Sequence, residues 1–429
     1  MDNLIAVILS TDAQNNSKKV YSLLSAASTN VLLSNTSSGQ HPLHLLDPAS
    51  HTVAYLFILN AHMVNADRSA QTHLLGYAHR FAISFNPAEL VCCSSLLVSF
   101  AETLTLCLKG SPKPLVAVLL AICHSLDTFD SCITPMHHLL LRVCILAKNY
   151  RAAVRTMEAS LMGVASSIFQ NTATDFLLYF YYGGIAYVGL KRFVDAKRCF
   201  EICLNAPTVT ASHIQVEAFK KHTLVSLLAT GEQPVLLKSI SLAVQRACRL
   251  NADEYRKFAD DCGSLNIARA QAKAKQCADL FKADSNTGLV NQILADMVRR
   301  KIQQLTLTYL TLSLAEIGKN AGFPADDTAR TESLLLKMIA DDQIYATISH
   351  RDNGMVSFHD MPSAYDGLNT THKLETLMFR TIDTEKAIVA QTWKIRTSQV
   401  YIERAFGGKA PRSANSHRMS SFDDDLLFK

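Results

Sequence analysis

Histidine pairs come closest, in this sequence, to a pattern that could do chemistry. His41 and His44 lie in a proline-containing loop without a carboxylate partner, and His137 and His138 follow a proline at the predicted start of a helix. A zinc or general-base site needs further ligands or an orienting acid at a defined spacing. We therefore expect these histidines to lie at the surface or to cap helices.

The motifs of the common enzyme classes are absent from the sequence. It contains no GxxxxGK[ST] phosphate loop, no GxGxxG after a predicted strand, no GxSxG turn, no HExxH helix and no metalloprotease-type His/Asp constellation. His359 and Asp360 end the last predicted strand, and with no third ligand nearby we expect them to close a hairpin. The sequence thus predicts no catalytic residue, no metal site and no cofactor.

The eleven cysteines also favour a structural role. Cys199 and Cys203 are neighbours on one face of a predicted helix, Cys92 and Cys93 are adjacent, and no CxxC pair occurs. Because metal sites and disulfide frameworks use regular cysteine spacings, we expect buried thiols in a reducing compartment. A redox or zinc role is the alternative.

Residues 288–360 are the part of the chain where the period of the apolar residues changes. Helical spacing continues into Arg299, Arg300 and Lys301, a basic turn that suits a helix C-terminus. Ser313 and Glu316 match a capping box at the start of a second, short helix. A third helix is predicted from four apolar residues that share one face: Leu334, Leu335, Met338 and Ile339.

The period then falls to two, which is typical of strands. Apolar residues alternate from 344 to 348, and a second run over 355–358 follows Asn353-Gly354, a dipeptide that readily takes positive φ. Three helices and a hairpin predict a winged helix. Such a module either enters a DNA groove or contacts another protein.

Charge favours a protein partner over a nucleic acid. The third helix, which would enter the groove, carries Glu332, Asp341 and Asp342 against Lys337, so it would repel a phosphate backbone. The formal charge of the whole chain is +5, which is small for 429 residues, and Lys and Arg do not gather on one predicted face. Neither direct nucleic-acid binding nor membrane binding is therefore predicted.

Composition indicates a large, well-buried protein. Of the 429 residues 48 % are hydrophobic and 18 % are charged, which excludes global disorder. The first residues lack a basic region, and the longest apolar run, 115–123, is far below the roughly 20 residues that span a bilayer. We expect a protein of the cytoplasm and nucleus, without a signal peptide.

The first 270 residues predict helix after helix, with short breaks that contain glycine or proline. Paired antiparallel helices of this kind stack into a right-handed, tetratricopeptide-like solenoid. The fold class is therefore all-α dominated, with a solenoid, a winged helix and a long C-terminal helix. Over residues 180–207 we expect four positions to pack two helices together: Gly184, Tyr187, Ala196 and Phe200.

Residues 372–406 predict one long helix. Its apolar stripe, about 100° wide at 100° per residue, comprises Leu374, Met378, Ile382, Val389, Trp393 and Val400. Because this helix follows the winged helix, we expect the stripe to pack against partner helices; local folding back is the alternative. Residues 407–429 predict a disordered tail, in which Ser420 and Ser421 precede acidic residues at a spacing that acidophilic kinases accept.

Four segments of the chain resemble a known family. They are YFYYGGIAYVGLKRFVDA, HIQVEAFKKHTLVSLL, GLVNQILADMVRRKIQQLTLTYLTLSLAEI and MIADDQIYATISHRDNGMVSFHD, and the closing GMVSFHD is the most specific. A helical solenoid that runs into a winged helix is the arrangement of the PCI module of the proteasome lid, the COP-9 signalosome and a translation-initiation complex. Over residues 140–400 the sequence is similar to the subunit 3 family of the signalosome.

This resemblance implies a non-catalytic scaffold. In that family the signalosome removes the ubiquitin-like modifier Nedd8 from cullins, and the metalloprotease chemistry belongs to another subunit. The implied organisation is helical repeats over 1–190, a PCI domain over 191–361, a bundle helix over 372–406 and a tail over 407–429. Signalosome subunits 1 and 8 would be the neighbours, and contact with cullin-RING ligases would be indirect.

Carried onto this sequence, the resemblance implies two contact surfaces. The C-terminal helices of the family gather in a common bundle, which here would take the apolar stripe of residues 372–406. Winged helices of PCI subunits associate side by side in an open arc. Here those contacts would come from Leu334, Leu335, Met338, Ile339, Ile344, Ala346, Ile348, Val356 and Phe358.

Two alternatives stay open on the sequence alone. One is the same kind of scaffold in the proteasome lid or a translation-initiation complex. The other is a winged helix that binds nucleic acid through Arg299, Arg300 and Lys301, for which salt-sensitive binding of duplex DNA would be the sign.

Overall fold

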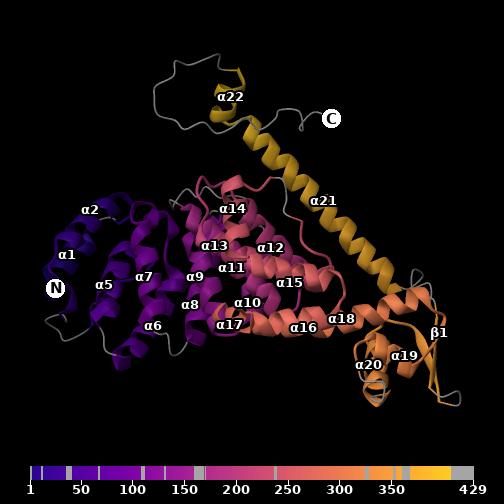
Figure 1. Ribbon diagram of the computed structural model, residues 1–429. Helices are drawn as coiled ribbons and strands as arrows, with labels where there is room; N and C mark the ends of the chain where they lie inside the picture. The colour runs from indigo at the N-terminus through magenta and orange to yellow at the C-terminus, as the bar shows by residue number, and fades with distance from the viewer. Residues whose placement is uncertain are drawn as a thin grey trace. The chain divides into compact units, whose positions relative to one another are not determined.

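Two compact units make up the chain, Met1–Asp360 and Met361–Lys429. The computed structural model describes residues 2–10, 13–34, 41–65, 68–107, 112–129, 132–158, 169, 171–235, 239–323, 328–350, 354–359 and 368–406. The predicted fold class is confirmed, since stacked helices lead into a winged helix within the first unit (Figure 1). The predicted tail, with Ser420 and Ser421, lies outside the described residues.

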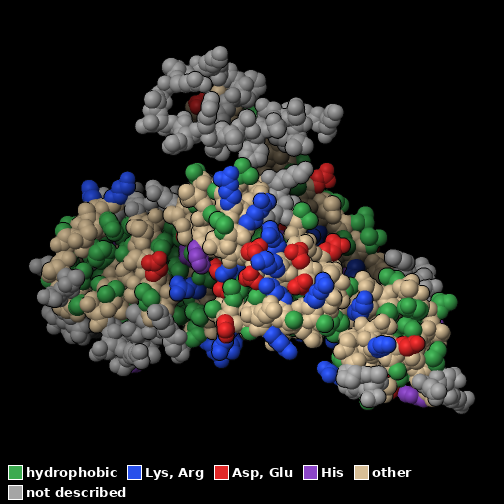
Figure 2. All heavy atoms as spheres, in the orientation of Figure 1, with side chains coloured by type: hydrophobic (Ala, Val, Ile, Leu, Met, Phe, Trp, Pro, Cys, Tyr) green, Lys and Arg blue, Asp and Glu red, His purple; other side chains and the backbone are tan. Residues whose placement is uncertain are grey.

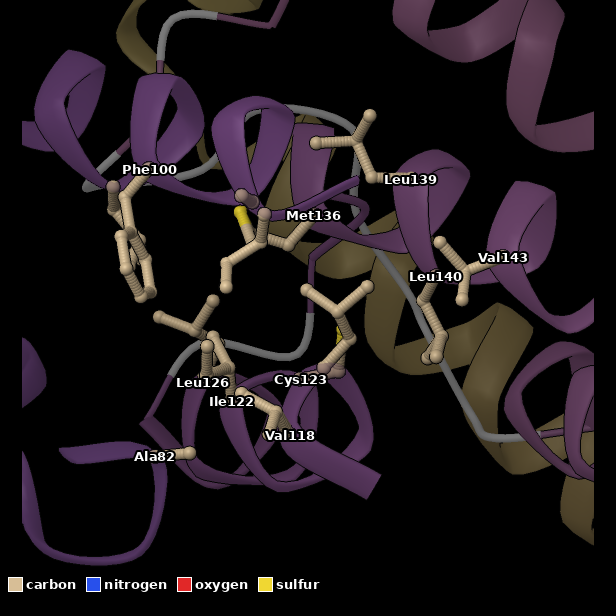
Figure 3. Packing of buried hydrophobic residues seen from close by; sticks show 14 of the residues in the cluster. Ala82, Phe100, Val118, Ile122, Cys123, Leu126, Met136, Leu139, Leu140 and Val143 are labelled. Carbon is tan, nitrogen blue, oxygen red and sulfur yellow. The ribbon is translucent and has the colours of Figure 1, made fainter. Parts of the chain in front are cut away.

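The solenoid begins with short antiparallel helices. They are α1 (Asp2–Ser10), α2 (Ala13–Ala26), α3 (Thr29–Leu33), α4 (Pro42–Leu45), α5 (Thr52–Asn65), α6 (Arg68–Ser84), the 3-10 turn η1 (Pro87–Cys92), α7 (Ser94–Cys107) and α8 (Pro112–Phe129). Figure 3 shows how the apolar faces meet: Ile122 and Leu126 of α8 face Met136 of the next helix, with Phe100 beside them. This burial of aliphatic and aromatic side chains is what holds the stacked helices together.

The middle of the solenoid contains its closest helix packing. The helices are α9 (Pro135–Leu146), α10 (Tyr150–Glu158), α11 (Ala173–Gly189), α12 (Phe193–Asn205) and α13 (His213–Ala229). Gly184 on α11 faces Phe200 on α12 so closely that a Cβ on this glycine would lie 2.6 Å from the ring. Ala196 and Phe200 are fully buried and Tyr187 is buried beside them. All four residues therefore lie in the helix packing.

One long helix joins the solenoid to the winged helix. After α14 (Leu242–Asn251), α15 (Asp253–Gly263), α16 (Ile267–Gln276) and α17 (Ala278–Ala283), α18 runs over Thr287–Thr308. Its first half buries Ile293 and Met297 in the solenoid core, and its second half buries Ile302 and Leu305 in the winged-helix core. The predicted helix end at the basic turn is therefore wrong, because the apolar spacing continues into the second core.

The winged helix is built from α18, α19 (Leu314–Asn320), α20 (Thr328–Ala340) and a three-stranded antiparallel sheet. The sheet order is β1-β3-β2, with β1 at Thr311–Ser313, β2 at Ala346–Ser349 and β3 at Met355–Phe358. The capping box of Ser313 and Glu316 is confirmed. The sequence did not predict β1, because three residues directly before a helix cap are too few to display a period of two.

The second unit consists, in its described part, of α21 (Leu368–Arg396) and α22 (Gln399–Phe406). The prediction of one helix over 372–406 is wrong, because the first helix ends at Arg396 and Ser398 begins a second one. Thr397 Oγ1 donates to the Trp393 carbonyl at 2.8 Å and Ser398 Oγ to the Ile395 carbonyl at 2.7 Å. Ser398 Oγ also accepts the Tyr401 N–H at 3.4 Å, which caps the start of α22. Val400 therefore belongs to α22, and its side chain lies outside the described residues.

Candidate functional site

One group of side chains in the solenoid has the composition of a catalytic triad. His137 Nε2 lies 3.0 Å from Asp127 Oδ1, and His137 Nδ1 lies 2.8 Å from Thr134 Oγ1. The Thr134 N–H also donates to Nδ1, at 3.0 Å, so this nitrogen already accepts a helix-cap hydrogen bond. Thr134 and His137 are buried away from solvent. A substrate could not reach the hydroxyl, so the group caps α9 and does not act as a nucleophile.

The other histidines singled out by the sequence are also held in place by packing. His138 was expected at the surface or in a helix cap, but it is buried and the cap of α9 is formed by Thr134 and His137. Burial lowers the pKa of His138 although Asp175 lies 3.6 Å away. His41 caps α4 and stacks on Tyr77, and burial with two neighbouring histidines lowers its pKa to about 4. His359 Nε2 lies 3.0 Å from Thr347 Oγ1 and joins the ends of β3 and β2. Within the described ranges no group of His, Cys, Asp and Glu could hold a metal ion.

The cysteines that the structure describes are mostly buried thiols. Burial raises the pKa of Cys144 to about 11 and the pKa of both Cys199 and Cys203 to about 12. A thiol with such a pKa carries almost no thiolate at neutral pH, and the thiolate is the nucleophile and the metal ligand. These side chains therefore pack as small apolar groups.

The basic turn on α18 is engaged in contacts within the chain. Arg300 Nε donates to Asp296 Oδ2 at 2.6 Å, and Arg300 Nη2 donates to the Leu228 carbonyl at 2.9 Å. Arg299 Nη1 lies 3.6 Å from Asp341 Oδ2 of α20. Figure 2 shows acidic and basic side chains interspersed on the visible face around α15, not a basic patch. No observation therefore favours binding of nucleic acid through this turn.

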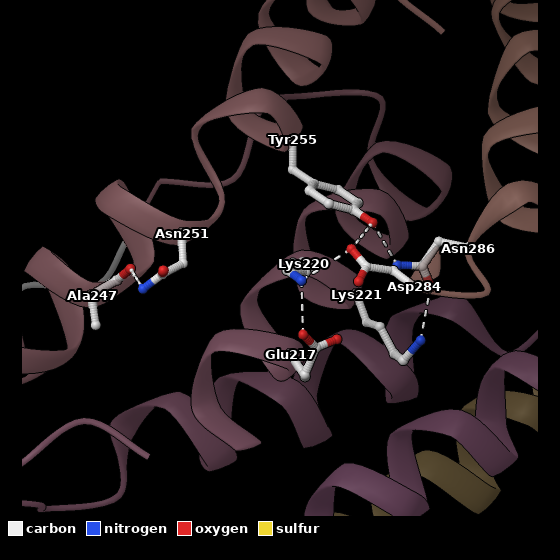
Figure 4. A network of polar contacts seen from close by, with 8 residues as sticks. All are labelled: Glu217, Lys220, Lys221, Ala247, Asn251, Tyr255, Asp284 and Asn286. Carbon is white, nitrogen blue, oxygen red and sulfur yellow. Dashed lines mark hydrogen bonds and ion pairs between the residues drawn. The ribbon is translucent and has the colours of Figure 1, made fainter. Parts of the chain in front are cut away.

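A connected polar network joins α13 to α15 and to the residues before α18 (Figure 4). Lys220 Nζ lies 2.7 Å from Glu217 Oε1 and 3.0 Å from Asp284 Oδ2. Tyr255 Oη donates to Asp284 Oδ2 at 2.7 Å and accepts from Asn286 Nδ2 at 2.9 Å. Asn286 and Tyr255 are fully buried, and their side chains hydrogen-bond to each other inside the protein.

A second charged partner completes the network. Lys221 Nζ donates to Asn286 Oδ1 at 2.8 Å. Burial lowers the pKa of Lys221, against the attraction of Glu217 and Asp284. Burial alone would lower the pKa of Lys220 as well, but its hydrogen bonds to two carboxylates outweigh that effect and raise it. The network acts as a structural tie between helices, because its polar groups are occupied by one another.

Exposed apolar side chains gather on α21. Of the predicted stripe, Leu374, Met378, Ile382, Val389 and Trp393 are exposed, the last to 69 %. Further exposed residues, which the sequence analysis did not single out, are Leu377, Phe379, Ile388 and Ile395. With 100° of rotation per residue, most of these nine exposed residues fall in a sector about 160° wide around the helix axis. We call this set the α21 face.

The winged helix presents less apolar surface than predicted. Among the nine predicted contact residues, Leu335, Met338, Ile344, Val356 and Phe358 are buried in the core of the winged helix itself, where they cannot meet a partner. Leu334, Ile339, Ala346 and Ile348 are partly buried against that core. Exposed apolar residues occur instead just before β1, at Leu307, Tyr309 and Leu310. The apolar residues of LTYL, shortly before the capping box, were the signal that sequence reasoning missed.

Both edges of the sheet belong to short strands. In the order β1-β3-β2 only β3 has neighbours on both sides, through pairs such as Leu312 with Val356 and Ile348 with Val356. Strands β1 and β2 each leave one side of their backbone unpaired within the sheet. An edge of this kind can pair with a strand of another protein.

Comparison with known proteins places the whole arrangement in a family. Residues 14–244 match the profile "COP9 signalosome complex subunit 3, N-terminal helical repeats", and residues 273–360 match the PCI domain. The chain is 28 % identical over 388 residues to COP9 signalosome complex subunit 3 of Dictyostelium discoideum, with 90 % of each chain covered. It is 25 % identical over 414 residues to the Drosophila melanogaster protein of that name, with 91 % of each covered.

These matches agree with the geometry of a subunit that contacts other proteins. No bilayer-spanning candidate occurs among the helices that the structure describes. Exposed apolar residues occur singly over the solenoid, and they also form a row on α21 and a short group beside the edge of the winged-helix sheet. Because the helical-repeat profile alone covers more than half of the sequence, this chain belongs to the COP9 signalosome subunit 3 family.

Proposed function

We propose that this chain is a non-catalytic scaffold subunit of the COP-9 signalosome. It supports the removal of Nedd8 from cullins by holding other subunits in place, while the chemistry is carried by a different subunit. Family membership supports this role. The burial of Thr134 and His137 supports it as well, because the side chains closest to a catalytic arrangement serve as a helix cap.

The α21 face is the observation that carries the proposal. Burying one large apolar side chain contributes about 1.5–3 kcal/mol, so leaving a whole row of them in water is costly unless a partner covers it. A two-helix contact needs only a narrow seam, whereas a sector of about 160° can pack against two or more helices. The α21 face therefore suits a bundle to which several subunits contribute their C-terminal helices.

The winged helix supplies the second contact in this proposal. Its unpaired strand edges β1 and β2, with Tyr309 and Leu310 next to β1, suit side-by-side association with the winged helices of two neighbours. We assign these neighbours as signalosome subunits 1 and 8. The partly buried Leu334, Ile339, Ala346 and Ile348 would complete their shared surfaces.

The test is assembly of the complex with Ile382→Asp combined with Trp393→Ala. The matched control is Arg380→Ala combined with Lys394→Ala, on the polar side of the same helix. After co-expression with the other subunits and affinity purification, the first pair of changes should remove this chain from the stoichiometric complex, whereas the control should leave it there. Mass spectrometry of the companions distinguishes the signalosome from the proteasome lid or an initiation complex.

Circular dichroism and thermal unfolding of the isolated variants provide the necessary check on folding. Both side chains of the first variant are exposed, so its fold should be unchanged. Stoichiometric assembly of the Ile382 and Trp393 double variant would show that the bundle assignment is wrong.

A further inference from the structure

A groove follows α18 along one side, lined by Val290, Leu294 and Val298. It consists of two adjoining cavities of about 420 and 380 Å³, which share Gln271 of α16 and Leu294 of α18. The first cavity lies between α16, α17 and the start of α18, and the second continues to α20 of the winged helix. We call these two cavities together the α18 groove; their lining residues reach from the solenoid to the winged helix within the first unit.

The floor of the α18 groove is apolar. Phe281 and Val290 line the first cavity, Val298 and Leu334 line the second, and Leu294 lines both. From Thr287 to Val298 the groove follows twelve residues of α18, a rise of about 16 Å, which matches roughly three turns of a docked helix. A groove between helices with apolar residues along its floor is the common receptor for an amphipathic helix.

The charged side chains at the walls of the α18 groove are all basic. Lys275 stands in the last turn of α16, on the first cavity, and Lys337 stands in the last turn of α20, on the second. Arg330, also on the second cavity, lies with its guanidinium carbon 4.7 Å from the centre of the Phe323 ring. Lys275 and Lys337 are exposed, so their ammonium groups are available to a bound partner. No carboxylate lines the described walls of either cavity.

We propose that the α18 groove binds an amphipathic helix of another protein whose polar flanks are acidic. Leucine-like side chains of the partner would cover the floor, and its carboxylates would meet Lys275 on one wall and Lys337 on the other. Charge complementarity of this kind selects an acidic partner over a basic one. This contact is separate from the proposed assembly role, because it uses neither the α21 face nor the sheet edges. Of the winged-helix residues proposed to contact neighbouring subunits, it uses only Leu334.

The direct test uses the purified full chain and a synthetic helix as probe. The probe is a fluorescein-labelled 18-residue peptide with Leu at positions i, i+3, i+4 and i+7 and Glu around the rest of the helix; a second peptide has Lys in place of every Glu. Fluorescence anisotropy should show micromolar binding of the acidic peptide and at least about tenfold weaker binding of the basic one, with affinity that falls as salt rises. Equal affinities for the two peptides, or no binding of the acidic one at about 100 μM, would overturn the proposal.

Variants locate the binding on the α18 groove. Lys275→Glu with Lys337→Glu should weaken the acidic peptide about tenfold, because two attractive contacts become repulsive. Lys18→Glu with Lys19→Glu, on exposed positions of α2, changes the net charge equally and should have no effect. Asn291→Trp, an exposed position inside the groove, should block binding by filling it without disturbing the core.

Two results would contradict this location. The first is unchanged peptide binding in both groove variants, which would place the probe elsewhere on the chain. The second is duplex DNA that competes with the peptide and loses affinity in the same lysine variant, which would show a phosphate-binding surface instead. The peptide-binding assay is independent of co-purification with signalosome subunits. If the peptide does not bind, the assembly proposal still stands. If the chain does not co-purify with the subunits, the peptide assay still tests the α18 groove.

Discussion

The two longest helices of this protein use their apolar residues in opposite ways. In α18, with 22 residues, the buried apolar positions are divided between the solenoid core and the winged-helix core, and Leu307 near its end is exposed. In α21, with 29 residues, the apolar positions are exposed. Both helices have an apolar sector, so the local pattern is the same, and the difference lies in what the rest of the chain offers them. An apolar stripe predicts that one side of a helix will be covered, but it does not predict whether the same chain or a partner covers it.

The largest effect is expected from a substitution in α18, the helix whose apolar residues are buried. Ile302→Ala on α18 removes a fully buried side chain from the winged-helix core and should lower the free energy of unfolding by about 2–5 kcal/mol, through lost burial and the cavity left behind. Urea unfolding followed by circular dichroism measures the change. A loss below about 0.5 kcal/mol would mean that α18 does not hold the two cores together as described.

A smaller effect is expected from the polar tie beside α18. Tyr255→Phe removes the hydroxyl that donates to Asp284 and accepts from Asn286, and leaves both partners short of a hydrogen bond inside the protein. We expect a loss of about 1–3 kcal/mol. Tyr309→Phe, at an exposed tyrosine, is the matched control and should change the stability by no more than about 0.5 kcal/mol.

A third prediction concerns Glu89, a buried carboxyl group of the first unit whose titration should make the stability depend on pH. Burial raises the pKa of Glu89, against hydrogen bonds from Thr52 and Asn86, and the Thr52 N–H donates to Glu89 Oε2 at 3.1 Å at the start of α5. Because the folded-state pKa lies above the unfolded one, the stabilising contribution of the carboxyl group is present at low pH. It is lost as the pH rises through the folded pKa.

Glu89→Gln keeps an acceptor for the Thr52 N–H and removes this titration. Between pH 4 and pH 7 the stability of the variant relative to the unchanged protein should therefore rise. Urea unfolding at both pH values measures this difference. A relative stability that falls over the same range would show that the ionised carboxylate stabilises the fold.

Local patterns predicted the elements of this fold well where they are long and periodic. The solenoid, the capping box at Ser313 and the third helix of the winged helix followed from spacing and cap chemistry. Strand β1 and the break at Ser398 did not, because each depends on a few side chains whose partners are set by the tertiary structure or by competing hydroxyl hydrogen bonds.

The candidate surfaces were harder to predict than the elements. Leu335 and Leu334 are adjacent on one predicted apolar helix, yet one is fully buried in the core and the other lines the α18 groove. A sequence pattern identifies the apolar side of a helix, which the chain itself covers first. The groove arises only where α16, α18 and α20 meet, so no stretch of sequence indicates it.

The smallest effect is expected from a substitution in α21, the helix whose apolar residues are exposed. Ile382→Ala on α21 is the same kind of truncation as Ile302→Ala, but the side chain is 43 % exposed and is not part of any described core. The isolated chain should therefore change in stability by no more than about 0.5 kcal/mol, and the better helix propensity of alanine should offset part of any loss. The same urea titration measures it. A loss of 2 kcal/mol or more, the range expected for a buried isoleucine, would show that α21 is covered by its own chain in solution, and the contrast between the two helices would disappear.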